Sequence, residues 1–82
     1  MLHAILKHTE PFAMTGIFKT NIATREDRQY MINVIKHHFD VDSCYVDLED
    51  CDKVLRITGM TVDEYTMISF VRQHGFLCEI LE

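Results

Sequence analysis

Cysteine side chains bring most of the potential for metal or redox chemistry to this 82-residue chain. The three of them, Cys44, Cys51 and Cys78, are too widely and irregularly spaced for a disulfide framework or a C-x-x-C site, so we expect reduced thiols. Cys44 and Cys78 fall on the inward positions of predicted strands and are expected in the core. Cys51 lies in an acidic turn, where we expect a surface thiol. A weaker alternative makes Cys51 a metal ligand.

The histidines and acidic residues give weaker indications of a metal-binding or catalytic site than the cysteines do. His37 and His38 are adjacent on a predicted helix, so they point about 100° apart and cannot chelate one ion as an i,i+4 pair would. The acidic residues of the middle of the chain lack the glycine and terminal glutamate spacing of an EF-hand, which favours a solvated acidic edge. No arrangement typical of an active site can be argued from the spacing, so we expect no enzyme.

Charge and hydropathy argue against nucleic-acid-binding and membrane proteins. Eight basic against thirteen acidic residues give a formal charge of -5, which repels phosphate backbones, so no nucleic-acid partner is expected. No apolar run approaches the roughly 18 residues of a membrane helix, and the N-terminal run is too short for a signal-peptide core. We therefore expect a cytoplasmic protein without membrane insertion.

Two helices are predicted from polar caps and apolar spacing. The first should run from about residue 25 to residue 38, because Thr24 offers an N-cap hydroxyl and Asp27 follows three residues later. Its inward face is expected to consist of Met31, Val34, Ile35 and His38. The second helix is expected after Thr61-x-x-Glu64, a second capping pattern, with Gly75 at its C-terminal cap. Its inward face is expected to consist of Val62, Tyr65, Ile68 and Val71.

Four strands are predicted before, between and after these helices along the chain. Alternation predicts the first over residues 16–22, the second through Cys44, Val46 and Leu48, and the third through Leu55 and Ile57, with a turn at residues 49–52. The fourth carries Phe76, Cys78 and Ile80. The order β-α-β-β-α-β predicts an α+β, ferredoxin-like sandwich over residues 14–82, with a four-stranded antiparallel sheet and both helices on one face. Residues 1–13, with Pro11 near their end, are expected to form an extension that is flexible or packs on the sheet.

Several segments in this order carry a resemblance to a known family. They are residues 18–22 (FKTNI), 46–48 (VDL), 52–55 (DKVL) and 61–76, which end in VRQHGF. Together, over residues 16–82, they resemble the heavy-metal-associated domain, the fold of small copper chaperones and of N-terminal domains of metal-transporting ATPases. The resemblance implies a metal-binding C-x-x-C pair at the entry to the first helix.

Thr24 and Asp27 occupy the positions that match this cysteine pair. A hydroxyl and a carboxylate do not form the soft thiolate site that Cu(I) prefers, so the family's metal chemistry is not carried over and no metal or other cofactor is expected there. Arg28, where the family has an apolar residue, adds positive charge beside these positions. We expect Thr24 to serve as a helix cap instead.

The sheet face away from the helices is the other candidate site. Ile17 on the first strand and Leu77 and Leu81 on the fourth should share it, because these strands are neighbours in the ferredoxin-like order. An exposed apolar patch of this kind is typical of a docking surface. A protein partner, a second copy or the apolar residues of the extension would cover it.

Three functional hypotheses follow. The first is a non-enzymatic domain of this type without the thiol pair, acting as a protein-interaction or self-associating module, with a protein partner or a homodimer. The second is a copper or zinc binding or transfer protein that uses non-standard cysteine or histidine ligands. The third is a regulatory domain that binds a small molecule.

Overall fold

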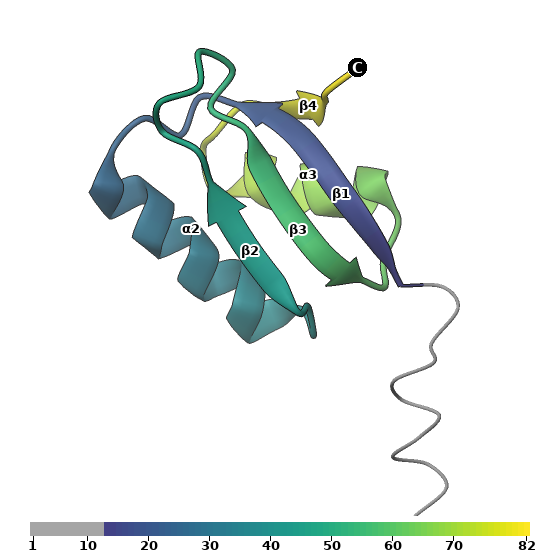
Figure 1. The fold of residues 1–82 in the computed structure, drawn as a ribbon. Helices are drawn as coiled ribbons and strands as arrows, with labels where there is room; N and C mark the ends of the chain where they lie inside the picture. Colours follow the sequence, from purple (N-terminus) through teal and green to yellow (C-terminus); the bar gives the residue numbers. More distant parts are fainter. Residues whose placement is uncertain (1–12) are drawn as a thin grey trace, which may run out of the picture.

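The computed structural model describes residues 13–82, which form six elements in the predicted order (Figure 1). The strands are β1 (Met14–Thr20), β2 (Ser43–Val46), β3 (Leu55–Met60) and β4 (Cys78–Ile80). The helices are α2 (Arg25–His38) and α3 (Glu64–Gln73). Residues 1–12 lie outside the described part, so the expected N-terminal extension stays a prediction.

The four strands form one antiparallel sheet in the order β2-β3-β1-β4. Both helices lie on the same side of this sheet, so no helix or strand of residues 13–82 covers its other face (Figure 1). This is the ferredoxin-like α+β arrangement, which confirms the predicted fold class. Strands β1 and β4, near the two ends of the described chain, are neighbours.

Strand β1 alternates between the two faces. Gly16, Phe18 and Thr20 are buried on the helix side, whereas Lys19 is exposed on the open face. Glycine is required at position 16 because a Cβ there would lie 2.7 Å from the Phe18 ring and 2.9 Å from Cε of Met60. The strand ends at Thr20, two residues earlier than predicted.

Helix α2 has the predicted ends. Thr24 is its N-cap, and Met31 and Ile35 are buried as expected. His38 was expected to face the sheet, and this is wrong: its ring is exposed and stacks on Phe70 of α3 at 4.8 Å between ring centroids. The His38 side chain therefore faces the neighbouring helix, whereas Ile35 in the same turn faces the sheet.

Helix α3 starts later than predicted. Its N-cap is Asp63, whose carboxylate accepts a hydrogen bond from the Thr66 amide at 2.8 Å, so the assignment of Thr61 as a cap is wrong. This two-residue shift changes the inward face, which is Met67, Ile68 and Val71. Tyr65, expected on that face, is 72% exposed.

The C-terminal end of α3 confirms the glycine cap. Gly75 has a φ of +92°, and its amide donates to the Arg72 carbonyl at 3.0 Å. A residue in the left-handed region ends a helix most easily when it is glycine. The chain then turns back to form β4 beside β1.

The connection between β2 and β3 is longer than predicted. Strand β2 ends at Val46, so Leu48 lies in the turn rather than in the strand. Lys53 has a positive φ of 46° near the end of this connection, and its Nζ donates to the Leu48 carbonyl at 2.7 Å. The connection is therefore held by its own hydrogen bonds.

The core lies between the sheet and the helices and draws on every element. Its fully buried large side chains are Phe18, Ile22, Met31, Ile35, Val46, Leu55, Ile57, Met60, Met67, Val71 and Cys78. Burial of such side chains is the main stabilising contribution in a domain of this size.

Candidate functional site

At the corner between β1 and α2, the side chain of Thr24 caps the N-terminus of α2. The Asp27 amide donates to Oγ1 of Thr24 at 3.0 Å, which satisfies one of the free N–H groups of the first helical turn. Ile22, just before this corner, is fully buried, and its amide donates to Oγ1 of Thr20 at 3.2 Å. Thr24 and Asp27 thus stand three residues apart at the start of a helix, with the Thr24 hydroxyl engaged by the backbone.

Arg28 lies beside this corner. Its guanidinium carbon is 5.2 Å from the ring centroid of Tyr45, and its Nη1 donates to the Tyr45 hydroxyl at 3.2 Å. Nη1 also approaches the Val46 carbonyl at 3.5 Å. A cation fixed against the ring and the edge of β2 makes the corner unfavourable for a metal ion.

The turn that holds Cys51 is joined to the end of β1. The Thr20 amide donates to the Asp52 carbonyl at 3.0 Å, and Oγ1 of Thr20 donates to the Lys53 carbonyl at 2.6 Å. Cys51 itself is exposed, as predicted. Its sulfur and one carboxylate oxygen each of Asp50 and Asp52 lie within 4.8 Å of one another.

Those three side chains form a loose set of possible ligands. The Asp50 carboxylate already accepts the Asp52 amide at 2.7 Å, and Asp52 faces Lys19 at 3.8 Å. One sulfur and two oxygens do not form the closed four-ligand shell of a structural zinc site. As the only such group in residues 13–82, it is the place where the copper or zinc hypothesis has geometric support.

Cys44 and Cys78 are buried and free, as predicted for core residues. Burial raises the pKa of the Cys44 thiol to about 11, against a smaller opposing effect of Lys36. Burial also raises the pKa of the Cys78 thiol to about 12, with Arg72 acting in the other direction. Neither thiol supplies a thiolate for metal or redox chemistry near neutral pH.

Ile17 and Leu81 are brought together on the open sheet face. The Leu81 amide donates to the Ile17 carbonyl at 3.1 Å, which extends the β1–β4 pairing by one residue. Both side chains line a hollow of about 270 Å³ with Val54, Tyr45, Arg56, Asp47 and Asp50. This apolar pair and its charged surroundings run across the sheet because Ile17 pairs with Arg56, and Arg56 pairs with Tyr45.

Leu77 lies apart from this pair. Its amide donates to Oδ1 of Asn21 at 2.8 Å, beyond the other end of the β1–β4 pairing. The paired residues Lys19 and Glu79 separate it from Leu81. Leu77 is 65% exposed, so it forms a separate apolar position rather than part of one patch.

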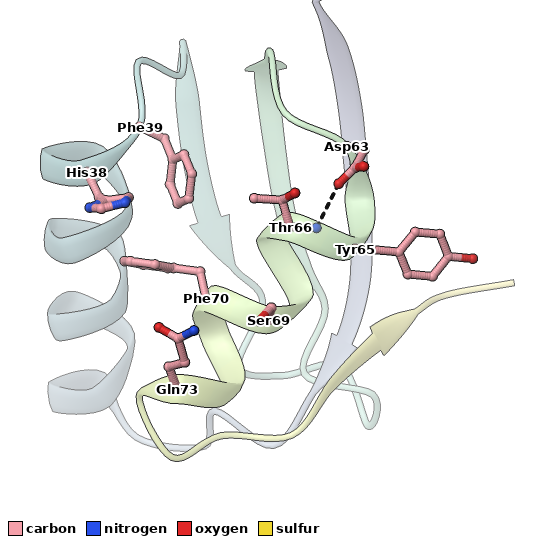
Figure 2. A pocket seen from close by; sticks show the side chains of 8 residues that line it. All are labelled: His38, Phe39, Asp63, Tyr65, Thr66, Ser69, Phe70 and Gln73. Atoms are coloured by element: carbon pink, nitrogen blue, oxygen red, sulfur yellow. Dashed lines mark hydrogen bonds between the residues drawn. The ribbon is translucent and has the colours of Figure 1, made fainter.

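A second hollowed surface lies between the two helices, and no local sequence pattern predicted it. Figure 2 shows Phe70 projecting from α3 toward α2, where His38 and Phe39 lie. Two hollows flank Phe70 and His38: one of about 450 Å³, which Asp63, Thr66 and six other residues line, and one of about 490 Å³. The second is lined by Asn33, Val34, His37, His38, Phe70 and His74.

Comparison with protein-family models, with curated proteins and with solved structures finds no match for this chain. The likeness to the heavy-metal-associated domain therefore rests on the sequence segments quoted above and on a fold that many unrelated functions share. Within residues 13–82, neither helix is long and apolar enough to cross a membrane.

Proposed function

We propose that this chain is a non-enzymatic domain of the heavy-metal-associated type that lacks the thiol pair and acts as a self-associating protein-interaction module. The docking surface is the open face of the sheet around Ile17 and Leu81. The corner of Thr24 and Asp27 serves the helix and holds no metal. The observation that carries the proposal is the pairing of Ile17 with Leu81 over a hollow on a sheet face that neither α2 nor α3 covers.

The apolar part of this face is small and central. Ile17, Val54 and Leu81 are all partly exposed and line the same hollow, and Tyr45, 55% exposed, stands at its rim. An aromatic ring beside aliphatic side chains is typical of the residues that dominate the energy of protein interfaces. A second sheet face packed here would remove these side chains from water.

The charges around the hollow favour a second copy of the same chain. Arg56 lines the hollow together with Asp47 and Asp50, so both signs of charge stand beside the same apolar pair. A twofold interface uses the same patch on both chains, so an axis through the hollow brings the Arg56 and the acidic residues of both copies into one interface. Such an arrangement lowers the repulsion expected between two chains of net charge -5.

Sedimentation velocity over a range of concentrations tests this. The wild-type chain is expected to form a dimer with a dissociation constant of about 1 mM or tighter. Ile17→Glu and Leu81→Glu should each shift the equilibrium to monomer by bringing charge into the apolar pair. Tyr65→Glu is the matched control, since Tyr65 is an exposed aromatic on α3, on the helix side of the sheet. Leu77→Glu should have a smaller effect than Leu81→Glu.

A monomeric wild type at all concentrations, or a dimer that Ile17→Glu and Leu81→Glu leave intact, would contradict the proposal. Circular dichroism of each variant checks that it is folded. Both positions are on the solvent side of the sheet, so the variants keep the core residues on the helix side unchanged.

Metal binding is the second candidate, and the proximity of Asp50, Cys51 and Asp52 favours it. One thiol with two carboxylates suits Zn²⁺ better than Cu(I), because Zn²⁺ accepts oxygen as well as sulfur ligands. The remaining ligand positions would be filled by water or by a second chain.

Titration of the reduced protein with Zn²⁺ and with Cu(I) tests this candidate. Stoichiometric binding tighter than about 1 μM that is lost in Cys51→Ser supports it. Binding that survives in Cys51→Ser, or no binding in this range, counts against it. Cys44→Ala is the matched control, because that thiol is buried on the helix side.

A further inference from the structure

The surface between α2 and α3 carries a chain of aromatic rings. Tyr30 contacts His74 at 5.7 Å between ring centroids, His74 contacts Phe70 at 4.6 Å, Phe70 contacts His38 at 4.8 Å, and His38 contacts Phe39 at 4.7 Å. Tyr30 and His38 come from α2, and Phe70 and His74 come from α3. The helices are therefore bridged on their outer side by rings rather than by aliphatic side chains.

The hollow beside this chain of rings is large enough for a small molecule. We call it the helix groove and define it by Asn33, Val34, His37, His38, Phe70 and His74, which line about 490 Å³. Cavities of about 300–1,000 Å³ are typical of small-molecule sites in proteins. Val34 and Phe70 are partly buried and provide the apolar wall of the helix groove.

The hydrogen bonds already present leave an acceptor on His74 and a donor on Asn33 available to a ligand. Nδ1 of His74 lies 2.9 Å from the Phe70 carbonyl, which only accepts, so Nδ1 carries the hydrogen and Nε2 of the neutral ring is an acceptor. Oδ1 of Asn33 accepts from Nε2 of Gln29 at 2.9 Å. The Nδ2 group of Asn33 is therefore still available to donate, on the helix opposite His74.

The helix groove contrasts with the rest of the chain in charge. None of its six lining residues is acidic, lysine or arginine, although the chain has thirteen acidic residues. A ligand bound there meets rings, an amide and imidazoles, and no acidic, lysine or arginine side chain. This favours an uncharged ligand over a phosphorylated one, which the net charge of -5 repels.

We propose that the helix groove binds a neutral, planar heteroaromatic compound. Its ring lies against the part of Phe70 that lines the helix groove, where contact between aromatic rings is favourable, and its polar edge, with one donor and one acceptor side by side, pairs with Nε2 of His74 and the amide of Asn33. Lactam-bearing bicyclic rings belong to this class. The helix groove and the open sheet face lie on opposite sides of the sheet, so this site is independent of the proposed self-association.

Nuclear magnetic resonance titration of ¹⁵N-labelled protein with quinazolin-4-one tests the proposal. This neutral bicyclic ring has an N–H donor next to a carbonyl acceptor, and quinazoline is the same ring without that pair. We expect saturable shifts confined to residues around the helix groove, with a Kd below about 1 mM. Quinazoline is expected to bind about fivefold more weakly, the effect of lost hydrogen bonds.

Variants locate the binding. His74→Phe keeps a ring and removes the acceptor, and Asn33→Leu removes the donor at an exposed helical position that tolerates leucine. Each should weaken binding of quinazolin-4-one about fivefold. Glu79→Gln, an exposed position on β4 that lines neither the helix groove nor the hollow of the open sheet face, is the control and should leave the titration unchanged.

Three results would overturn the proposal: no saturation up to about 5 mM, equal affinity for the two probes, or binding that survives unchanged in both variants. The dispersed spectrum of each variant reports whether it is folded. His74 also bonds to the Phe70 carbonyl, so His74→Phe could lose stability as well as the acceptor. If that variant is unfolded, the titration of Asn33→Leu alone tests the proposal.

Discussion

The guanidinium of Arg28 lies over the ring of Tyr45 and also donates to its hydroxyl, with 5.2 Å from the guanidinium carbon to the ring centroid and 3.2 Å between Nη1 and Oη. Nη1 also reaches the carbonyl of Val46. Arg28 thereby joins the first turns of α2 to β2, an edge strand of the sheet. A charged side chain over an edge strand discourages further strand pairing, which is consistent with docking through the open face rather than the β2 edge.

A double-mutant cycle measures this contact. Arg28→Ala and Tyr45→Leu should show a coupling of about 0.5–1 kcal/mol in urea unfolding, the range of an exposed cation–π pair. Tyr45→Phe keeps the ring and should retain most of the coupling. Zero coupling between Arg28 and Tyr45 would mean that the contact contributes nothing to stability.

Cysteines at the corner of β1 and α2 should restore metal binding if the family likeness holds. The double variant Thr24→Cys with Asp27→Cys, made with Cys51→Ser, is expected to bind one Cu(I) more tightly than about 1 μM in competition with a chelator. Loss of the Thr24 cap should lower stability by about 1 kcal/mol. Serine at both positions is the matched control. A folded double-cysteine variant without Cu(I) affinity would count against the likeness.

Thiol reagents should distinguish the three cysteines. At pH 8 the folded protein is expected to react rapidly with Ellman's reagent at Cys51 alone, because Cys51 is exposed and the other two are buried. All three should react after unfolding in urea. Mass spectrometry of the digested protein identifies the labelled residue. Rapid labelling of Cys44 or Cys78 in the folded state would contradict the described packing.

The buried thiols also predict how stability depends on alkaline pH. Their folded pKa values of about 11 for Cys44 and about 12 for Cys78 exceed the ordinary 9.0, so the unfolded chain loses these protons first. The contribution of these two thiols to the free energy of unfolding is fully present below pH 9 and is lost as pH rises from 9 toward 12. The stability difference between wild type and Cys78→Ala in urea unfolding should therefore narrow over this interval.

Two glycines form a matched pair for a backbone test. Gly59 and Gly75 both have positive φ, of +71° and +92°. A Cβ at Gly59 would lie 2.8 Å from the backbone nitrogen of Asp42, whereas a Cβ at Gly75 meets no atom within 4 Å. Gly75→Ala should cost about 1 kcal/mol from the left-handed backbone alone. Gly59→Ala should cost at least about 1 kcal/mol more in urea unfolding.

Local signals in the sequence were sufficient for α2 and for the order of elements. Thr24 was the one strong cap candidate before a regular apolar spacing, so both ends of that helix were predictable. At α3, both Thr61 and Asp63 offer a capping oxygen, and the apolar residues Val62 and Tyr65 extend the pattern in the wrong register. Only packing distinguishes them: burial of Met67 fixes the helix so that Asp63 is its cap.

Of the two candidate sites, the open sheet face could be predicted from the sequence and the helix groove could not. Strand alternation placed Ile17 and Leu81 on one face, and the antiparallel pairing of β1 with β4 brings them together. The helix groove depends on the spacing between two helices distant in sequence, so His38 and His74 gave no local pattern that joined them. His38 was assigned to the core because its position continued the apolar spacing of α2.

An isotope-filtered nuclear Overhauser experiment tests self-association through the open sheet face most directly. A sample that mixes ¹³C-labelled and unlabelled chains at about 1 mM should show cross-peaks between chains at the methyl groups of Ile17 and Leu81. Their absence, or cross-peaks between chains that involve only the helix side, such as Tyr65, would contradict the proposed function.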